Sequence, residues 1–518
     1  MFARIDDFLD KITMYRLVLY ELMLLLGIAA VLGAFGILPY NPLSLALTTG
    51  MFIVFSYITN KVFSYVYKAP TNVESVYITS LILALITQPM QLPTVIVSLA
   101  SLKGVVLTTI FIGWLSVWSM ASKYIFSIKK KHLFNPVAIA AVIVAVFLGQ
   151  SVTWWVGTAW MAPFVALFGL LIVRKMQRTD LVFSFFLSAA VTVGVYTILI
   201  GGNLLTIFQM LLFSSSFLFF GFVMLTEPLT TPPTKKLQIL YGALVGFLFT
   251  PQVHIGSMYS TPELALVVGN IFSYIVSPKQ KVVLRLKEKI QSGLDQIDFV
   301  FTSPERLQFT PGQYMEWTLP HPHADGRGNR RYFTLANSPT EPDVHLGVKF
   351  YPNGSSYKKA LALFSGHHAI AAGALAGDFT LPKDKTKKLV FLAGGIGITP
   401  FRSMVKYVVD TKEKRDIALF YSNKVASEIM YHTVWNEAMF AGIQVILTLT
   451  DMGKIPQNWM GERGRISAEM IKKKVPDYMD RTFYLSGPHA MIEGFDQTLR
   501  SMGVHELHIK KDFFPGFA

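Results

Sequence analysis

Apolar residues form long unbroken runs in the first half of the chain, whereas the second half alternates short apolar and polar segments. Up to residue 277 these runs approach the ~20 residues that a helix needs to cross the hydrocarbon of a bilayer. There are ten of them, the third and ninth being short for a span: 17–38, 43–66, 73–88, 94–122, 135–150, 156–173, 181–200, 204–225, 238–251 and 261–277. The pattern predicts an α-helical polytopic membrane bundle of about ten transmembrane helices.

The pattern changes after residue 278. Residues 279–386 show the turns and alternating strands of an antiparallel β-barrel. Residues 389–409 then read as strand, glycine-rich turn and helix, and further buried strands at 417–422, 443–450 and 481–487 are separated by helical patterns. This order predicts a parallel α/β sheet. We therefore expect three domains: a transmembrane domain (1–278), a barrel (279–386) and an α/β nucleotide-binding domain (387–518).

Composition supports a membrane protein and excludes several cofactors. The chain is 52% hydrophobic and only 15% charged, which is too apolar for an ordinary soluble protein. It contains no cysteine, which excludes disulfides, cysteine-ligated iron–sulfur clusters and c-type haem attachment. We expect no metal site.

The basic residues predict the topology. If the chain starts inside, every inside loop of the ten-span arrangement carries Lys or Arg and no outside loop does, with Lys103 alone lying within a span. The inside residues are Lys61, Lys68, Lys129, Lys130, Lys131, Arg174, Lys175, Arg178, Lys235, Lys236, Lys279 and Lys281. We expect an uncleaved, multi-pass protein of the cytoplasmic membrane with both termini cytoplasmic. The net charge of +15 is then explained by topology and the lipid bilayer, without nucleic acid.

The membrane half contains an internal repeat. TQPMQLP (87–93) and TEPLTTP (226–232) both read T-x-P-x-x-x-P and are separated by five spans, so the second copy would be inverted. An inverted 5+5 repeat with proline-broken helix ends favours a site between the halves, whose candidates are Thr87, Thr226 and Glu227. Two simpler explanations are that the prolines only end helices, and that Glu227 is a loop carboxylate neutralised by Lys235 or Lys236.

Four blocks of the membrane half resemble a known family. TSLILALITQP (79–89), KKHLFNPVAIA (130–140), residues 225–248 and residues 262–278 look like the membrane subunit shared by the Rnf and Nqr redox ion pumps. The resemblance implies a flavin-binding subunit that passes electrons across the membrane. Members of that family attach FMN through a threonine in an S/T-G-A-T motif, which is absent here. Any FMN or riboflavin in this domain is therefore expected to be non-covalent.

The second half resembles the ferredoxin–NADP reductase superfamily. FTPGQYMEW (309–317) matches its F-x-P-G-Q-Y strand, and RYFT (331–334) matches its R-x-Y-S/T motif. The resemblance implies that Arg331 pairs the FAD pyrophosphate, which suits its bidentate fork. It places Phe333, preceded by Tyr332, on the isoalloxazine and the Thr334 hydroxyl at flavin N5. Without the resemblance, this segment reads as an ordinary strand with an exposed arginine.

Three further motifs of the same family follow. VKFYPNGSSYKKAL (348–361) matches the second phosphate loop, which implies cofactor contacts at Val348, Gly354, Ser355 and Ser356. LAGGIGITPFRSM (392–404) matches the nicotinamide-nucleotide motif, with its glycines at a helix start where backbone amides can meet phosphate. The residues implied there are Gly394, Gly395, Gly397, Thr399 and Pro400.

The last matches lie near the C-terminus. LSGPHAM (485–491) resembles the C-G-P-x-x-M block, implying contacts from Gly487, Pro488 and Met491, with Ser486 donating near the nicotinamide in place of cysteine. The aromatic end DFFPGFA (512–518) implies that Phe517 or a neighbouring phenylalanine covers the flavin until nicotinamide displaces it.

The choice between NADH and NADPH stays open. Ser422 and Lys424 are candidates for holding a 2′-phosphate, and no acid in that segment favours a free ribose. Arg402 and Arg415 read as solvated helix charges.

Together these features predict a membrane flavoprotein oxidoreductase. It would take hydride from cytosolic NAD(P)H onto FAD and pass electrons through a membrane flavin to an extracytosolic acceptor, for which the Rnf/Nqr likeness suggests a flavinylated FMN-binding protein. A haem enzyme is a competing hypothesis, but it needs about four helix histidines, and the membrane half has only His132 and His254, in predicted loops. Two further hypotheses are a flavin or small-molecule transporter with a redox-sensing domain, and a quinone reductase at the inner leaflet.

Overall fold

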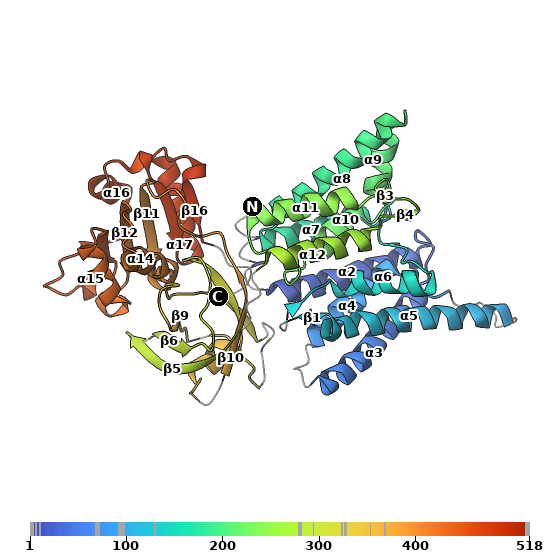
Figure 1. Cartoon of the computed structure of the whole chain (residues 1–518), viewed down its shortest axis with the longest axis horizontal. Coiled ribbons are helices and arrows are strands. Elements are labelled where there is room, and N and C mark those ends of the chain that lie inside the picture. Colours follow the sequence, from blue (N-terminus) through green and yellow to red (C-terminus); the bar gives the residue numbers. More distant parts are fainter. Residues whose placement is uncertain are drawn as a thin grey trace. The chain divides into compact units, whose positions relative to one another are not determined.

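The computed structural model divides the chain into two compact units, one built on residues 1–279 and the other on residues 280–514. Figure 1 shows the first as a bundle of helices and the second as two β-sheets with associated helices. The structure describes residues 5, 8–9, 12–67, 73–91, 99–128, 131–277, 282–293, 295–322, 325, 329–352, 354–366 and 369–512.

Helices make up most of the N-terminal unit. They are α2 (Met14–Ala34), α3 (Pro42–Val66), α4 (Val73–Ile86), α5 (Leu99–Ile125), α6 (Pro136–Leu148), α7 (Ala162–Met176), α8 (Thr179–Leu199), α9 (Leu204–Phe213), α10 (Phe217–Phe219), the π-helix η1 (Phe220–Met224), α11 (Lys235–Leu248) and α12 (Pro262–Val276). Two short hairpins are formed by β1 (Ser127–Ile128) with β2 (Lys131–His132), and by β3 (His254–Ile255) with β4 (Met258–Tyr259).

Helix occurs in each of the ten predicted apolar runs, but the helices differ in length. Within the described residues, four are long and apolar enough to cross a membrane, namely α2, α3, α8 and residues 103–125 of α5. A fifth span results if α9 and the α10–η1 segment, bent by 59° at their junction, count as one. The other apolar helices are shorter: α6, with 13 residues, is about 20 Å long. The existence of apolar helices is therefore confirmed, whereas ten crossings remain a prediction.

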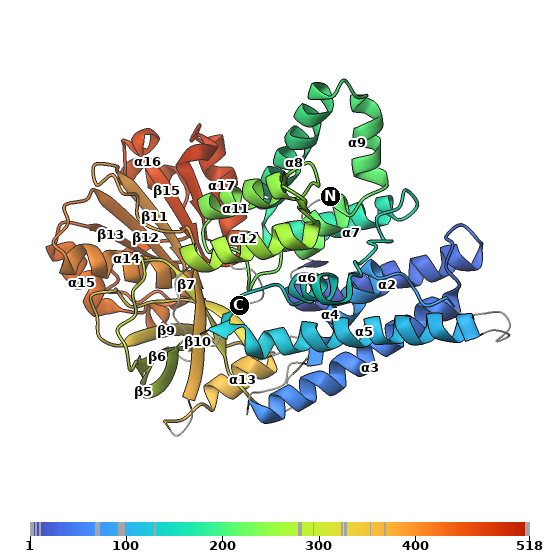
Figure 2. The ribbon, with the colours of Figure 1, turned by 45° about the vertical axis from the view of Figure 1, so that its right-hand side comes forward.

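Two local features explain how the sequence forms this unit. In the FNP segment, Asn135 caps α6: its Oδ1 accepts hydrogen bonds from the amides of Val137 (3.0 Å) and Ala138 (3.1 Å), with proline at the first helical position. In α11, Gly242 and Gly246 allow close packing on α8, which lies beside it in Figure 2. A Cβ added to Gly246 would lie 2.5 Å from the Phe185 carbonyl oxygen. Small residues at this spacing are a typical helix-packing device in membranes.

The first sheet of the C-terminal unit is the antiparallel β-barrel sheet. Its strands are β5 (Val282–Ser292), β6 (Gln296–Thr302), β7 (Tyr314–Thr318), β8 (Arg330–Thr334), β9 (Val344–Lys349) and β10 (Ala369–Ala376), in the order β8-β7-β10-β5-β6-β9. The short helix α13 (Ser356–Ala362) follows β9. A core that includes Phe299, Trp317 and Tyr357 fills the barrel.

The second sheet is parallel throughout, as predicted. Its strands are β11 (Leu389–Gly394), β12 (Ile417–Asn423), β13 (Gln444–Leu449), β14 (Glu462–Arg463), β15 (Thr482–Ser486) and β16 (Ile509–Lys511), in the order β14-β13-β12-β11-β15-β16. The helices are α14 (Thr399–Asp410), α15 (His432–Phe440), α16 (Ala468–Lys474) and α17 (His489–Ser501).

Helices cover both faces of this sheet. Phe391 of β11 packs in one core with residues of α14 and α15, whereas Leu392 packs in another with residues of α16 and α17. Successive side chains of a strand point to opposite faces, so a parallel strand covered on both sides is apolar throughout. All six residues of β11 are buried.

Candidate functional site

The predicted flavin-binding strand is β8, and its side chains alternate between two surroundings. Arg331 is 3% exposed, and its guanidinium carbon lies 5.2 Å from the centre of the Tyr357 ring. Phe333, on the same side of the strand, is buried with its ring centre 6.1 Å from that of Tyr357. Tyr332 instead donates its hydroxyl to Glu316 Oε2 on β7 (3.0 Å). The face predicted to meet FAD is thus the one that carries Arg331 and Phe333.

Thr334 at the end of β8 tests whether this strand fits FAD. Its side chain is buried, and within the part of the chain that the structure describes its hydroxyl has no hydrogen-bond partner. A buried hydroxyl without a partner is unfavourable, so such groups usually face a ligand or water. A flavin nitrogen would supply the missing partner, which makes this position compatible with FAD.

The predicted phosphate loop already has partners for its polar groups. The Ser356 amide donates to Asp325 Oδ2 (2.8 Å), and the Ser356 hydroxyl accepts from the Asp325 amide (2.9 Å). The Ser355 hydroxyl caps α13 by accepting from the Lys358 amide (3.3 Å). Gly354 lies beside this cap, and Val348 is buried in β9. The Asp325 carboxylate thus accepts a hydrogen bond from the Ser356 amide, one of the donors that the resemblance assigned to the pyrophosphate.

The glycine-rich turn follows β11 directly. Gly395 has a φ of +52°, and no atom lies within 4 Å of where its Cβ would stand, so a ligand can approach here. By contrast, a Cβ on Gly397 would lie 2.5 Å from the Gly487 amide nitrogen, and one on Gly394 would lie 2.2 Å from Met491 Sδ. These two glycines allow the turn to pack against the LSGPHAM segment, a role that differs from the one predicted.

The start of α14 contacts the barrel. Thr399 and Pro400 form its first turn, and a Cβ on Gly347 of β9 would lie 2.7 Å both from Thr399 Cγ2 and from the Tyr431 hydroxyl. The Tyr431 hydroxyl donates to Asp298 Oδ1 of β6 (3.2 Å). Burial raises the pKa of Tyr431 well above its ordinary value, and the Asp298 charge acts in the same direction. Tyr431, which directly precedes α15, therefore stays protonated and links this part of the nucleotide-binding domain to β6 of the barrel.

Ser486 is buried, and its hydroxyl donates to Asp512 Oδ2 (2.9 Å). We predicted that this hydroxyl donates near the nicotinamide, but in the structure its hydrogen bond goes to the Asp512 carboxylate. Gly487 and Pro488 follow, with Gly487 at a φ of +157°. Phe517 lies outside the described residues.

The sequence reasoning missed an acid near the predicted ribose position. Ser422 is buried in β12, and the Lys424 amide just beyond it donates to Glu428 Oε2 (3.1 Å). Glu428 Oε1 also pairs with Lys349 Nζ (3.1 Å). Burial alone would lower the pKa of Lys349, but Glu428 and Asp295 raise it above its ordinary value. An acidic side chain therefore lies beside Lys424. It belongs to Glu428, which follows four residues later, after a turn.

Two arginines that we predicted to be solvated are buried. Arg402 is 5% exposed and pairs with Glu341, Nη2 lying 2.8 Å from Oε1. Arg415 donates through Nε to Glu413 Oε2 (2.8 Å) and through Nη1 to the Pro382 carbonyl (3.1 Å). The prediction was wrong because Glu341 comes from the barrel, far away in sequence, and Pro382 from the segment before β11.

The candidates in the N-terminal unit lie at helix ends. Thr87 directly follows α4, is buried and has no partner for its hydroxyl among the described residues. Thr226 follows η1 and donates its hydroxyl back to the Phe222 carbonyl (2.7 Å). Glu227 accepts from the Thr230 hydroxyl (3.1 Å).

The cation that acts on Glu227 is Lys123 of α5, and the Asn135 side chain also interacts with its carboxylate. Lys123 in turn donates to Ser75 Oγ and Thr79 Oγ1 of α4, both at 3.0 Å. Lys235, which we considered as the neutralising partner, instead pairs with Asp180 (2.8 Å). Polar contacts therefore connect the second T-x-P motif to helices of the first half.

A group of three or more metal-ligating acids and histidines is absent from the described residues.

The C-terminal unit is similar in sequence to known proteins. The sequence model of the family described as oxidoreductase NAD-binding domain matches residues 391–497. The glycine betaine monooxygenase reductase subunit of Chromohalobacter salexigens is 27% identical over 239 residues, which are 45% of this chain and 63% of that protein. The flavohemoprotein of Rhodopirellula baltica is 26% identical over 223 residues, 40% of this chain and 53% of that protein.

Solved structures also match. The cytochrome P450 reductase of Amycolatopsis has 22% sequence identity and a TM-score of 0.40, over 45% of this chain and 70% of that one. The chain spans between about half and two thirds of the length of the curated relatives named here. Residues 391–497 thus match an oxidoreductase NAD-binding domain, and the C-terminal unit that holds them is similar in sequence to the reductase subunit and flavohemoprotein named above; we call this unit the reductase module.

Proposed function

We propose that this chain is a membrane flavoprotein that oxidises NAD(P)H at its C-terminal unit and passes the electrons through its N-terminal unit to an acceptor on the other side of the membrane. FAD, when bound, supplies the chemistry that accepts hydride and releases electrons singly. The observation that carries the proposal is that one chain joins a reductase module to apolar helices that enclose a connected polar cluster.

The C-terminal residues would bind and orient the cofactors. Arg331 would pair with the FAD pyrophosphate, with Phe333 beside the isoalloxazine and Thr334 donating to it. The open backbone at Gly395 would receive the nicotinamide nucleotide at the carboxyl edge of the parallel sheet, where such sheets bind ligands. The Ser486–Asp512 hydrogen bond would fix the end of β15, the strand next to β11.

The N-terminal unit would hold a non-covalent flavin, FMN or riboflavin, between its two halves. Glu227, Lys123 and Asn135 support this, because ionisable groups enclosed among membrane helices usually mark a functional site. Broken helix ends at Thr87 and Thr226 support it too, since such ends point to sites between inverted repeats. The proposed acceptor is an extracytosolic, flavinylated FMN-binding protein.

Quinone reduction at the inner leaflet is a second candidate. The short helices favour it, because a helix of 13 residues, such as α6, is about 10 Å shorter than the hydrocarbon core. A quinone that reached the cytosolic side would then need no electron path across the whole bilayer.

A vesicle experiment separates the two candidates. The purified full chain is inserted into liposomes that enclose ferricyanide, which cannot cross the bilayer, and NADH or NADPH is added outside. Reduction of the enclosed ferricyanide without added quinone supports electron transfer by the chain itself. Reduction only after a lipid-soluble quinone is added contradicts that proposal and favours the second candidate.

A flavin count accompanies this test. Two or more acid-extractable flavins per chain are expected, one of them FAD. A single FAD would contradict a self-contained path across the membrane.

A further inference from the structure

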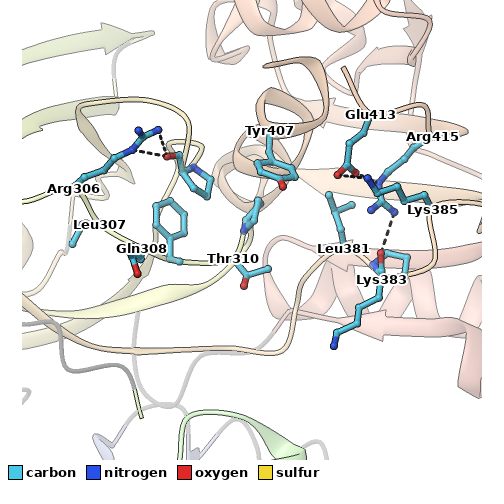
Figure 3. Close-up of a pocket in the computed structure, with 14 residues that line it drawn as sticks. Arg306, Leu307, Gln308, Thr310, Leu381, Lys383, Lys385, Tyr407, Glu413 and Arg415 are labelled. Carbon is cyan, nitrogen blue, oxygen red and sulfur yellow. Dashed lines mark hydrogen bonds and ion pairs between the residues drawn. The ribbon is translucent and has the colours of Figure 1, made fainter. Parts of the chain in front are cut away.

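A cavity of about 690 Å³ lies in the C-terminal unit (Figure 3). The cavity is next to the amino ends of β11 and β12, whereas the glycine-rich turn follows the carboxyl end of β11. Its lining includes the 381–385 segment, which precedes β11, and Arg415, which precedes β12. Tyr407, in the last turn of α14, also lines the cavity. Since β11 rises about 3.3 Å per residue, its six residues place the cavity roughly 17 Å from the turn. The cavity is therefore distinct from the nucleotide site.

Both parts of the reductase module line this cavity. The barrel contributes residues 306–311, just before β7, and Pro339. Arg306 fixes this side by donating through Nη2 to the Pro339 carbonyl (2.9 Å) and the Thr340 carbonyl (3.1 Å). The remaining lining is formed by the segment 381–385, which leads into β11, and by Tyr407, Glu413 and Arg415 of the nucleotide-binding domain. A molecule in the cavity would touch both domains.

The charge of the lining is strongly positive. Four lining side chains are cationic, and Glu413 is the one acid among them. Glu413 is already shared between Arg415 Nε (2.8 Å) and Lys385 Nζ (2.9 Å), as Figure 3 shows for the arginine. Lys383 is exposed, and no carboxylate of the described residues pairs with it. At least one cation at the rim thus has its charge available for a ligand.

The rest of the lining is largely apolar. The apolar lining residues include Leu307, Phe309, Pro311, Leu381 and Tyr407. Phe309 also packs against the barrel core, so this wall is held in place. The volume falls in the range of about 300–1,000 Å³ typical of small-molecule sites, which combine apolar walls with a few polar groups.

We propose that this cavity binds a small amphipathic anion, a carboxylate or phosphate ester on an apolar body. The body would lie against Phe309, Leu381 and Tyr407, and the anionic group would meet Lys383 at the rim. This inference does not depend on how the membrane unit functions.

The test uses the full chain in nanodiscs of zwitterionic phosphatidylcholine, saturated with FAD and NAD⁺ so that the nucleotide sites are filled. Binding of 1-naphthyl phosphate, 2-naphthoate, neutral 2-naphthamide and inorganic phosphate is measured by equilibrium dialysis against empty nanodiscs. We expect one saturable site per chain for at least one of the two aromatic anions. The amide and inorganic phosphate should each bind at least tenfold more weakly. Preference for the phosphate ester or the carboxylate identifies the anionic group and supports the proposal in either case.

Two variants assign the site. Lys383→Glu should weaken binding at least tenfold, and Thr310→Trp, which places a large ring at the exposed barrel rim, should block it. Lys473→Glu changes an exposed lysine on α16 in the same way and should leave binding unchanged. The proposal fails if no anion binds saturably, if the amide binds as tightly as the anions, or if neither Lys383→Glu nor Thr310→Trp weakens binding.

Discussion

Arg402 of α14 and Glu341 of the barrel form a two-point ion pair that joins the two domains of the reductase module. Nη2 lies 2.8 Å from Oε1, Nη1 meets Oε2, and Arg402 also donates to the Ala336 carbonyl (3.1 Å). Breaking a buried pair by removing one partner leaves an uncompensated charge, which costs about 3–5 kcal/mol. We expect Arg402→Ala to lower the melting temperature of the reductase module and the rate of NAD(P)H oxidation, measured in the same preparation.

Arg500→Ala is the matched control. Arg500 pairs with Asp496 and Glu506 on the surface, where ion pairs contribute about 0–1 kcal/mol. If the two substitutions lower the melting temperature equally, the Arg402–Glu341 pair stabilises the protein no more than a surface ion pair does.

A second ion-pair group predicts a pH dependence. Hydrogen bonds from Arg481 and Lys388 lower the pKa of Asp477 to about 2. Because the folded pKa lies below the unfolded value of about 3.9, the stabilisation is present above that value and is lost as pH falls from about 4 to about 2. The Asp477 side chain is 31% exposed, so solvent screens its ion pairs and we expect only about 1 kcal/mol. Asp477→Asn should lower the melting temperature at pH 7 and converge on the parent protein as the pH approaches 2, and a constant difference between pH 7 and pH 2 would contradict the assignment.

The order of the elements was predictable from the sequence because it depends on local patterns. Period-two strands, apolar strands such as β11 and the glycine turn at 394–397 each follow from neighbouring residues, and the parallel sheet confirms them. The number of membrane crossings was less predictable. An apolar run predicts a helix, but a bend such as the 59° break after α9 depends on packing between helices.

The contacts of the candidate site were harder to predict, since most join segments far apart in sequence. Nothing near Ser486 indicates that its hydroxyl meets Asp512, and nothing near Ser356 points to Asp325. Glu428 could have been considered, because it lies only four residues beyond Lys424, but a turn of unknown shape separates them. Motifs thus identify which residues come together at a site, whereas the hydrogen-bond partner of each polar atom depends on the tertiary fold.

Gly246 of α11 provides a packing test in the membrane unit. A Cβ there would lie 2.5 Å from the Phe185 carbonyl oxygen, a backbone atom that cannot move without shifting α8. We expect Gly246→Ala to destabilise this helix pair, visible as a lower melting temperature in detergent. Gly113→Ala in α5 is the control, since no atom lies within 4 Å of its Cβ and alanine favours helix by about 1 kcal/mol. Similar behaviour of the two variants would mean that α8 and α11 are not closely packed.

Thr334 tests the proposed flavin contact. Removing its hydroxyl by Thr334→Val removes one hydrogen bond, worth about 0.5–1.5 kcal/mol, so flavin reduction by NAD(P)H should slow by up to about tenfold. Thr334→Ser keeps the hydroxyl and should retain most of the rate. Stopped-flow absorbance of the bound flavin measures both. If the valine variant is as fast as the parent protein at equal flavin content, the hydroxyl does not contact the reacting part of the cofactor.

Glu227 tests whether the membrane unit carries electrons. Its carboxylate lies in a polar cluster with Thr230, Asn135 and Lys123. Glu227→Gln removes the charge and keeps the shape, leaving the Lys123 ammonium without its partner charge. We expect reduction of ferricyanide inside liposomes to fall at least tenfold, while reduction of ferricyanide added on the NAD(P)H side stays unchanged because that reaction needs only the reductase module.

Asp180→Asn is the control for this substitution. Asp180 is the acid at the start of α8 that pairs with Lys235 on an exposed surface, with side chains 48% and 65% exposed, and such pairs contribute little. Its removal should leave both reactions intact. If the Glu227→Gln variant reduces enclosed ferricyanide at the full rate, the polar cluster is not part of the electron path. Loss of both reactions would instead point to misfolding, which the flavin content and melting temperature of the same sample would reveal.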